Sequence, residues 1–316
     1  MSRIALAVFG ISPEEATFAR RGIPATEPSL QQHLESIGRT FIEGYRLALG
    51  GRRAQSLADE LSGRSASLRG FAFEGAAMGL ALLDLVSGGR RWRAFSEGPG
   101  RPFHYLLLVG AGWALARVPW RRWRLHQYPL GLDPFLGWLT VDGYGFHQGY
   151  FHARRFVFET REPREWQGYA RRAFDQGLGR SIWFVLAADP RAIAARIAAF
   201  DAARRQDLWS GAGLAAAYAG GANRSALEEM LNLAYQAGYV GALRQGAVFA
   251  ADARAVGDSP AEATELACRV LLGASAESAA ALASTTRPAP SPTSYEAWRA
   301  RLQQMLNDRS AVGSAR

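Results

Sequence analysis

A short pattern of a large apolar residue, polar residues and a glycine recurs along the chain. The stretch FHQG at 146–149 shows it, and related stretches bring the glycines of the pattern to seven: Gly44, Gly75, Gly110, Gly149, Gly177, Gly211 and Gly246. Their spacing runs from 28 residues (149 to 177) to 39 residues (110 to 149), with a mean of about 34 residues. Most are followed by alanine-rich segments of helical length that often end in Gly or Asp, which predicts helices with C-terminal glycine caps.

Further helical segments lie between these glycines. They include residues 54–63, 132–143, 189–205, 223–238 and 259–274, and two of them begin with an Asp-Pro pair that suits a helix N-terminus. A period of about 34 residues accommodates two helices and two turns. Because one such hairpin cannot bury its apolar face alone, successive copies must stack. We therefore predict an all-α fold of about seven helical-hairpin repeats, forming either an α-solenoid or a closed α/α ring.

The position of the glycines inside helices needs a reason, since glycine there costs about 1 kcal/mol relative to alanine. Close helix crossings supply one, because a missing side chain lets two backbones approach. Small residues on the same helices favour this explanation, namely Ala76, Gly79, Gly112 and Gly213.

Changes in composition predict the domain organisation. We expect an N-terminal cap at 1–36, the helical-repeat domain at 37–275, a linker rich in proline and serine at 276–294, and a terminal helix with a tail at 295–316.

Charge and cysteine content exclude several classes of protein. The net charge is +9 and all 37 basic residues are arginine, but they occur singly or in pairs, so no nucleic acid is expected as partner. The single cysteine, Cys268, excludes an internal disulfide and suits a buried, inert thiol. No window of about 18 apolar residues predicts a membrane span, and the apolar run at 4–11 is too short for a secretory signal. A cytoplasmic location is expected.

Polar residues that precede the repeat glycines form the candidate site. Equivalent positions of stacked repeats share one surface, so these side chains can converge on a groove or cavity. Acid–base chemistry would then fall to Glu43, Glu74, His147 and Asp175. The ligand-binding candidates are Arg69, Phe73, Trp113, Tyr144, Phe146, Gln148, Gln176, Trp183 and Trp209. The alternative is an internal brace, in which these polar groups pair with arginines of a neighbouring repeat.

Other chemical signatures are missing from the sequence. His147 and His152 are five residues apart, which does not suit two ligands of one ion on a regular helix, so no metal is expected. No cofactor motif is visible, and no cofactor is predicted. The sequence also shows no Ser-His-Asp or nucleophile-elbow pattern, and His104 is interpreted as an ordinary, partly buried histidine.

Several long blocks together resemble a bacterial family of uncharacterised function. They include ISPEEATFARRG, IGRTFIEGYRLAL, RGFAFEGAAMGLALLD, VDGYGFHQGYFH and DLWSGAGLAAAYAGG, and the resemblance covers about residues 1–275. Members of that family occur in gene clusters for enediyne polyketide biosynthesis. The resemblance implies an accessory protein that holds an apolar polyene or enediyne intermediate between repeat helices. Whether it also promotes modification or cyclisation of that molecule, and so is an enzyme at all, stays open.

A scaffold is the alternative function. Helical repeats commonly bind other proteins through a concave face, so the chain can organise biosynthetic enzymes of the same pathway or sequester their product. The sequence leaves the oligomeric state open.

Overall fold

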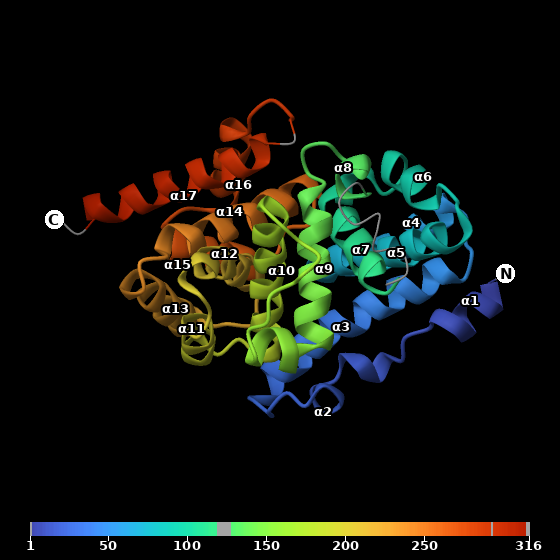
Figure 1. Ribbon diagram of the computed structural model, residues 1–316, viewed down its shortest axis with the longest axis horizontal. Coiled ribbons are helices and arrows are strands. Elements are labelled where there is room, and N and C mark those ends of the chain that lie inside the picture. Colours follow the sequence, from blue (N-terminus) through green and yellow to red (C-terminus); the bar gives the residue numbers. More distant parts are fainter. Residues whose placement is uncertain (1, 119–127, 292, 314–316) are drawn as a thin grey trace. The chain divides into compact units, whose positions relative to one another are not determined.

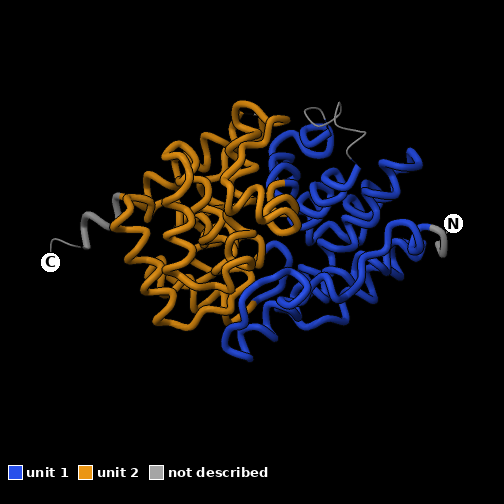
Figure 2. Tube along the Cα trace, turned by 60° about the horizontal axis from the view of Figure 1, so that its bottom comes forward, with its two compact units in different colours: residues 1–144, 256–260 blue, residues 145–255, 261–316 orange. Residues whose placement is uncertain are grey.

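The computed structural model describes residues 2–118, 128–291 and 293–313, and these fold into helices with no β-strand among them (Figure 1). The predicted all-α class is therefore confirmed for this part of the chain. The chain divides into two compact units, residues 1–144 with 256–260 and residues 145–255 with 261–316 (Figure 2). Each unit is described by itself.

Unit 1 contains the elements of the N-terminal half. They are α1 (Ser2–Phe9), η1 (Pro13–Ala16), α2 (Phe18–Arg21), α3 (Pro28–Leu49), α4 (Ala54–Ser62), α5 (Ala66–Ser87), α6 (Arg91–Glu97), η2 (Arg101–Phe103), α7 (His104–Ala116), α8 (Tyr128–Leu132) and the first half of α9 (Trp138–Phe151).

Unit 2 contains the second half of α9 and the elements that follow. They are η4 (Arg154–Phe158), α10 (Tyr169–Val185), α11 (Pro190–Ala198), α12 (Ala202–Tyr218), α13 (Arg224–Gln236), α14 (Val240–Val256), α15 (Glu262–Leu272), α16 (Ala276–Thr286) and α17 (Ser294–Gly313). Within it, α10 packs on α12, while α11 packs on α13 and α13 on α15.

Helices α3 and α5 of unit 1 cross at two glycines. A Cβ atom added to Gly44 would lie 2.0 Å from the carbonyl oxygen of Ala72, and one added to Gly75 would lie 1.9 Å from that of Phe41. Both distances are far below van der Waals contact, so only glycine lets the two backbones meet here. The predicted reason for glycine inside these helices is confirmed.

The same reciprocal contact recurs in unit 2. Between α10 and α12, a Cβ on Gly211 would meet the carbonyl oxygen of Gln176 at 1.9 Å, and one on Gly179 would meet that of Leu208 at 2.2 Å. Helices α12 and α14 cross in the same way through Gly213 and Gly246. In α9 the glycines that meet neighbouring carbonyl oxygens are Gly143 and Gly145, whereas Gly149 of the sequence pattern faces side chains of α10.

Helix α5 is the core of unit 1. By length and composition it could cross a membrane, but 78% of its most apolar 18-residue stretch is buried inside the protein. Among the described residues, the only other stretch long and apolar enough is α15 and α16 taken together, and these two helices meet at an angle of 73°. The hydropathy of α5 therefore follows from core packing, with Phe73 and Met78 almost completely buried.

Local signals set several helix ends, whereas one predicted boundary falls inside a helix and part of the predicted linker is helical. Asp189 caps α11 by accepting hydrogen bonds from the next backbone N–H groups, as its Asp-Pro pair predicted. Helix α3 begins at Pro28, so the boundary predicted after residue 36 falls inside a helix. Residues 276–286, predicted as the start of a linker, form α16, which begins at the capping side chain of Ser275.

Candidate functional site

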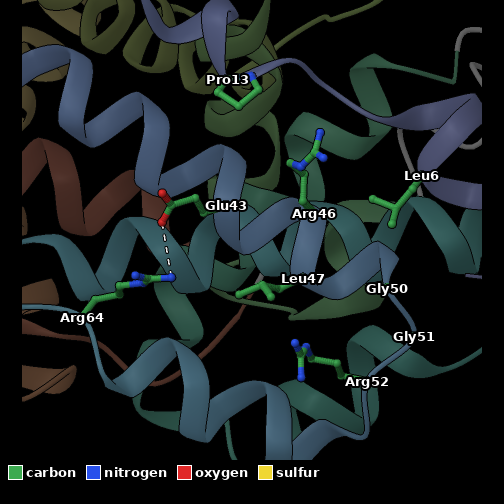
Figure 3. Close-up of a pocket in the computed structure, with 9 residues that line it drawn as sticks. All are labelled: Leu6, Pro13, Glu43, Arg46, Leu47, Gly50, Gly51, Arg52 and Arg64. Atoms are coloured by element: carbon green, nitrogen blue, oxygen red, sulfur yellow. Dashed lines mark ion pairs between the residues drawn. The ribbon is translucent and has the colours of Figure 1, made fainter. Parts of the chain in front are cut away.

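An open pocket of about 660 Å³ lies in unit 1 (Figure 3). Its lining comes from α1, η1, the second half of α3 and the loops at both ends of α4, and consists of Leu6, Pro13, Glu43, Arg46, Leu47, Gly50, Gly51, Arg52 and Arg64. A pocket of this size accommodates a small organic molecule.

One face of α3 forms the floor of the pocket. Glu43, Arg46, Leu47 and Gly50 are spaced by three, one and three residues, which places them on the same side of a helix. The helix ends at Gly50, whose N–H donates to the carbonyl oxygens of Arg46 and Leu47. The chain then reverses through Gly51, whose φ of 76° is left-handed, and this turn carries the next residue, Arg52, to the pocket.

Three guanidinium groups and one carboxylate line the pocket. Arg64 pairs with Glu43 at 3.3 Å, and Arg52 pairs with Glu60 at 3.1 Å. Arg46 donates to the backbone oxygen of Ile11 at 3.2 Å. A guanidinium carries five N–H donors, so each arginine retains donors for a further partner.

The chemistry of this lining suits an anionic ligand with an apolar part. Arginine binds carboxylate and phosphate groups through paired, charge-assisted hydrogen bonds. Leu6, Leu47 and Pro13 supply apolar surface beside the guanidinium groups. Figure 3 shows Glu43 turned toward Arg64, and Arg46 extending from α3 on the side of Pro13, with Arg52 and Arg64 on the other side of that helix.

The predicted catalytic carboxylates in unit 1 differ in their surroundings. Glu43 is half-exposed at the pocket, whereas Glu74, which also precedes a glycine of the sequence pattern, is 1% exposed in the core. Arg69, predicted to bind ligand, is partly buried and donates to the backbone oxygen of Arg64 at 3.4 Å. Of the predicted site residues in unit 1, therefore, Glu43 alone lies in the lining of the pocket.

The predicted catalytic residue Asp175 of unit 2 is part of a brace. Both of its carboxyl oxygens accept hydrogen bonds from Arg204, and both side chains are almost fully buried. Burial raises the pKa of Asp175 to about 6, against the lowering effect of Arg204. Here the geometry matches the alternative of an internal ion pair between neighbouring helices.

His147 and Gln148 are buried on α9. The His147 ring lies 4.8 Å from that of Phe151 and 6.2 Å from that of His152, measured between ring centroids. In the described part of the chain, no group of three or more His, Cys, Asp or Glu side chains is arranged to hold a metal ion.

The predicted ligand-binding aromatic residues are buried in the cores of the two units. In unit 1, Phe73 stacks on Phe103 at 4.1 Å between ring centroids, Trp113 packs on Phe41 at 4.5 Å, and Tyr144 is 3% exposed. The aromatic candidates of unit 2 are also buried, namely Phe146, Trp183 and Trp209, and so is Gln176. Trp183 also donates from Nε1 to the backbone oxygen of Gly220.

The C-terminal helix α17 completes a buried polar network in unit 2. Arg299, 1% exposed, donates to Asp207 at 3.0 Å and to the hydroxyls of Tyr169 and Ser210. Asp207 also pairs with Arg172 of α10. One turn further along α17, Gln303 donates to Gln245 of α14. The terminal helix predicted from the sequence is therefore part of the core of unit 2.

The pocket arginines were missed in the sequence because they occupy ordinary surface positions. One sequence feature could have indicated the pocket. Helix α3 has a face of mixed apolar and charged residues, and it ends at two successive glycines, Gly50 and Gly51. The contributions of Leu6 and Pro13 depend on how the N-terminal segment folds back, which no local pattern shows.

Comparison with known proteins gives a family but no function. The family model described as "Protein of unknown function (DUF1702)" matches residues 1–306, so the chain belongs to that family. No curated protein and no solved structure matches the chain.

Proposed function

We propose that the protein binds an amphipathic small molecule in the pocket of unit 1, with an anionic head group on the arginines and an apolar chain on the leucine and proline side chains. In this proposal it is an accessory protein of enediyne or related polyketide biosynthesis, and the ligand is a polyene intermediate that bears a carboxylate. The observation that carries the proposal is the set of three guanidinium groups around one pocket of about 660 Å³.

The position of the ligand follows from where space exists. The glycine crossings bring the backbones of α3 and α5 into contact, so a ligand cannot lie between these helices at the crossing. The pocket instead lies on the face of α3 that carries Glu43 and Arg46. We also propose that the helices are structural repeats. The support is the recurrent glycine crossings and the packing of α11 on α13 and of α13 on α15.

A binding titration tests the role of charge. A conjugated polyene fatty acid, which becomes fluorescent in an apolar site, is titrated with the protein alongside its methyl ester. A charge-assisted hydrogen bond contributes about 1.5–3 kcal/mol, so the acid is expected to bind at least about 10-fold more tightly than the ester. Equal affinities for acid and ester would reject the proposed role of the arginines.

A scaffold for biosynthetic enzymes, or a protein that sequesters the product, is the second candidate. Its support is the network in unit 2, where polar residues of the repeat helices are engaged by Arg299 and Gln303 of α17. Deletion of the gene in its native host separates both candidates from an unrelated role. Either candidate requires a changed metabolite profile, and an unchanged profile would contradict both.

A further inference from the structure

Three residues that are scattered in the sequence form a hydrogen-bonded chain in unit 1. Ser96 lies in α6, His104 begins α7, and Asp133 follows α8. The Oγ atom of Ser96 is 2.8 Å from Nδ1 of His104, and Nε2 of His104 is 2.9 Å from Oδ2 of Asp133. None of the three lines the pocket that contains Arg46, Arg52 and Arg64, called the arginine pocket below.

Asp133 determines which nitrogen of His104 carries the proton. Its other carboxyl oxygen accepts from the backbone N–H groups of Phe135 and Leu136 at 2.8 and 2.7 Å. Burial alone would raise the pKa of Asp133, but the hydrogen bonds from His104, Leu136 and Phe135 hold it below its usual value. Asp133 is therefore an ionised acceptor, and the neutral form of His104 beside it carries the proton on Nε2.

The consequence for Ser96 follows directly. With the proton on Nε2, the lone pair of Nδ1 faces the serine, so the hydroxyl of Ser96 donates to His104. A nucleophile bonded to a base, with the base oriented by a third group, is the arrangement that activates serine. Serine proteases use the two ring nitrogens the other way round, but the path of the proton is equivalent.

Hydrogen bonds of Trp92 hold α6 in place beside these three residues, and two of the three are partly exposed to solvent. Trp92 fixes α6 through two hydrogen bonds, from its backbone N–H to Asp84 and from Nε1 to the backbone oxygen of Leu107. Ser96 is 4% exposed, whereas the side chains of His104 and Asp133 are 24% and 22% exposed. Solvent therefore reaches His104 and Asp133, whereas Ser96 is almost fully enclosed, so an acyl group that reacts with the serine must be slim.

We propose that Ser96, His104 and Asp133 form an acyl-transfer site for small carboxylic esters. The Ser96 oxygen attacks the carbonyl carbon while its proton passes to Nδ1 of His104. The bond to the leaving alcohol oxygen breaks, and that oxygen takes the proton from His104. Water, deprotonated by His104, then attacks the acyl-serine, and the serine oxygen departs and regains the proton. Asp133 is the positioning residue. This site is independent of the ligand proposed for the arginine pocket.

The first test is covalent labelling with an alkyl fluorophosphonate, read by mass spectrometry of the intact protein and its peptides. The wild-type protein is expected to carry one adduct, on Ser96. Ser96→Ala should abolish it, and the matched control Ser87→Ala, an exposed serine on α5, should retain it. His104→Gln should slow labelling at least about 100-fold, since general-base catalysis contributes 10²–10⁴-fold. An unlabelled wild-type protein, or labelling of Ser96→Ala at the wild-type rate, would overturn the proposal.

A second test does not depend on the serine reacting with that probe. In Ser96→Cys, a basic His104 should promote thiolate formation and speed alkylation by iodoacetamide at pH 7. Cys268, buried and with a pKa raised to about 12, is the unreactive internal control. Adding Asp133→Asn should shift the pH midpoint of alkylation. A purely structural role of Asp133 would leave that midpoint unchanged. Alkylation at the rate of Cys268, or a midpoint unaffected by Asp133→Asn, would overturn the proposal.

Discussion

Asp175 of α10 and Arg204 of α12 form a buried ion pair in which Nε of the arginine lies 3.1 and 3.0 Å from the two carboxyl oxygens. Arg204 also donates to the backbone oxygen of Thr160 at 2.8 Å, so the pair joins two helices to the segment before α10. The raised pKa of Asp175, about 6, means that the free-energy cost of burying its charge exceeds the stabilisation that Arg204 provides.

Asp175→Asn should therefore change how stability depends on pH. The carboxyl pKa is 3.8 without the fold and about 6 within it, so the native state binds the extra proton between these values. The contribution of Asp175 to stability is full below about pH 4 and is lost as pH rises through 6, by about 3 kcal/mol. Urea unfolding at pH 4.5 and 7.5 measures most of this change, about 2 kcal/mol. Asparagine cannot ionise, so the stability difference between the variant and wild type should shift in favour of the variant from the lower to the higher pH, and a difference independent of pH would be inconsistent with the ion-pair energetics.

Gly75→Ala should destabilise unit 1 strongly. The new Cβ would lie 1.9 Å from the carbonyl oxygen of Phe41, so α3 and α5 must separate. Overpacking typically costs 1–3 kcal/mol, and a clash with backbone lies at or above the upper end. Gly131→Ala is the matched control, because nothing lies within 4 Å of its added Cβ. Thermal unfolding should show a lower Tm for the first variant alone, and equal Tm values would refute the close crossing.

Arg299→Ala should lower stability far more than Arg301→Ala. Arg299 is buried and binds Asp207, Tyr169 and Ser210, whereas Arg301, two residues along α17, is exposed. Removing one partner of a buried charge network costs about 3–5 kcal/mol, while an exposed arginine changes stability by less than about 0.5 kcal/mol. Chemical unfolding of both variants checks this, and similar losses would show that α17 is not part of the core.

Arg52→Gln should weaken binding of the polyene acid, and Arg53→Gln should not. Arg52 lines the pocket and Arg53, the next residue, does not. Glutamine keeps much of the chain length but removes the charge, so the loss for the acid is expected to be about 10-fold. The methyl ester should bind both variants alike. If the two glutamine variants bind the acid equally, the head group does not contact Arg52.

Periodicity in the sequence predicted the helical class and the purpose of the glycines, because both depend on local spacing. The glycines of α3 and α5 meet backbone oxygens as expected. The fourth copy differs, since Gly143 and Gly145 make the crossings of α9 in place of Gly149. A repeat glycine and a crossing glycine a turn away look alike in one sequence, so spacing alone cannot distinguish them.

The candidate site was much less predictable. Equivalent repeat positions were expected to share one environment, but Glu43 is half-exposed and Glu74 is buried. The bond from His104 to Asp133 joins residues 29 positions apart, and the pocket needs the N-terminal segment folded against α3. Such relationships arise from tertiary packing and leave no local signal.

Photoaffinity labelling shows whether the pocket of unit 1 binds an anionic amphipathic molecule. A long-chain fatty acid with a diazirine in its chain is irradiated with the protein, and the labelled peptides are identified by mass spectrometry. Labels are expected on peptides that contain Leu6, Pro13 or Leu47, and excess unlabelled acid should suppress them whereas its methyl ester should not. Labels confined to unit 2, or equal suppression by acid and ester, would contradict it.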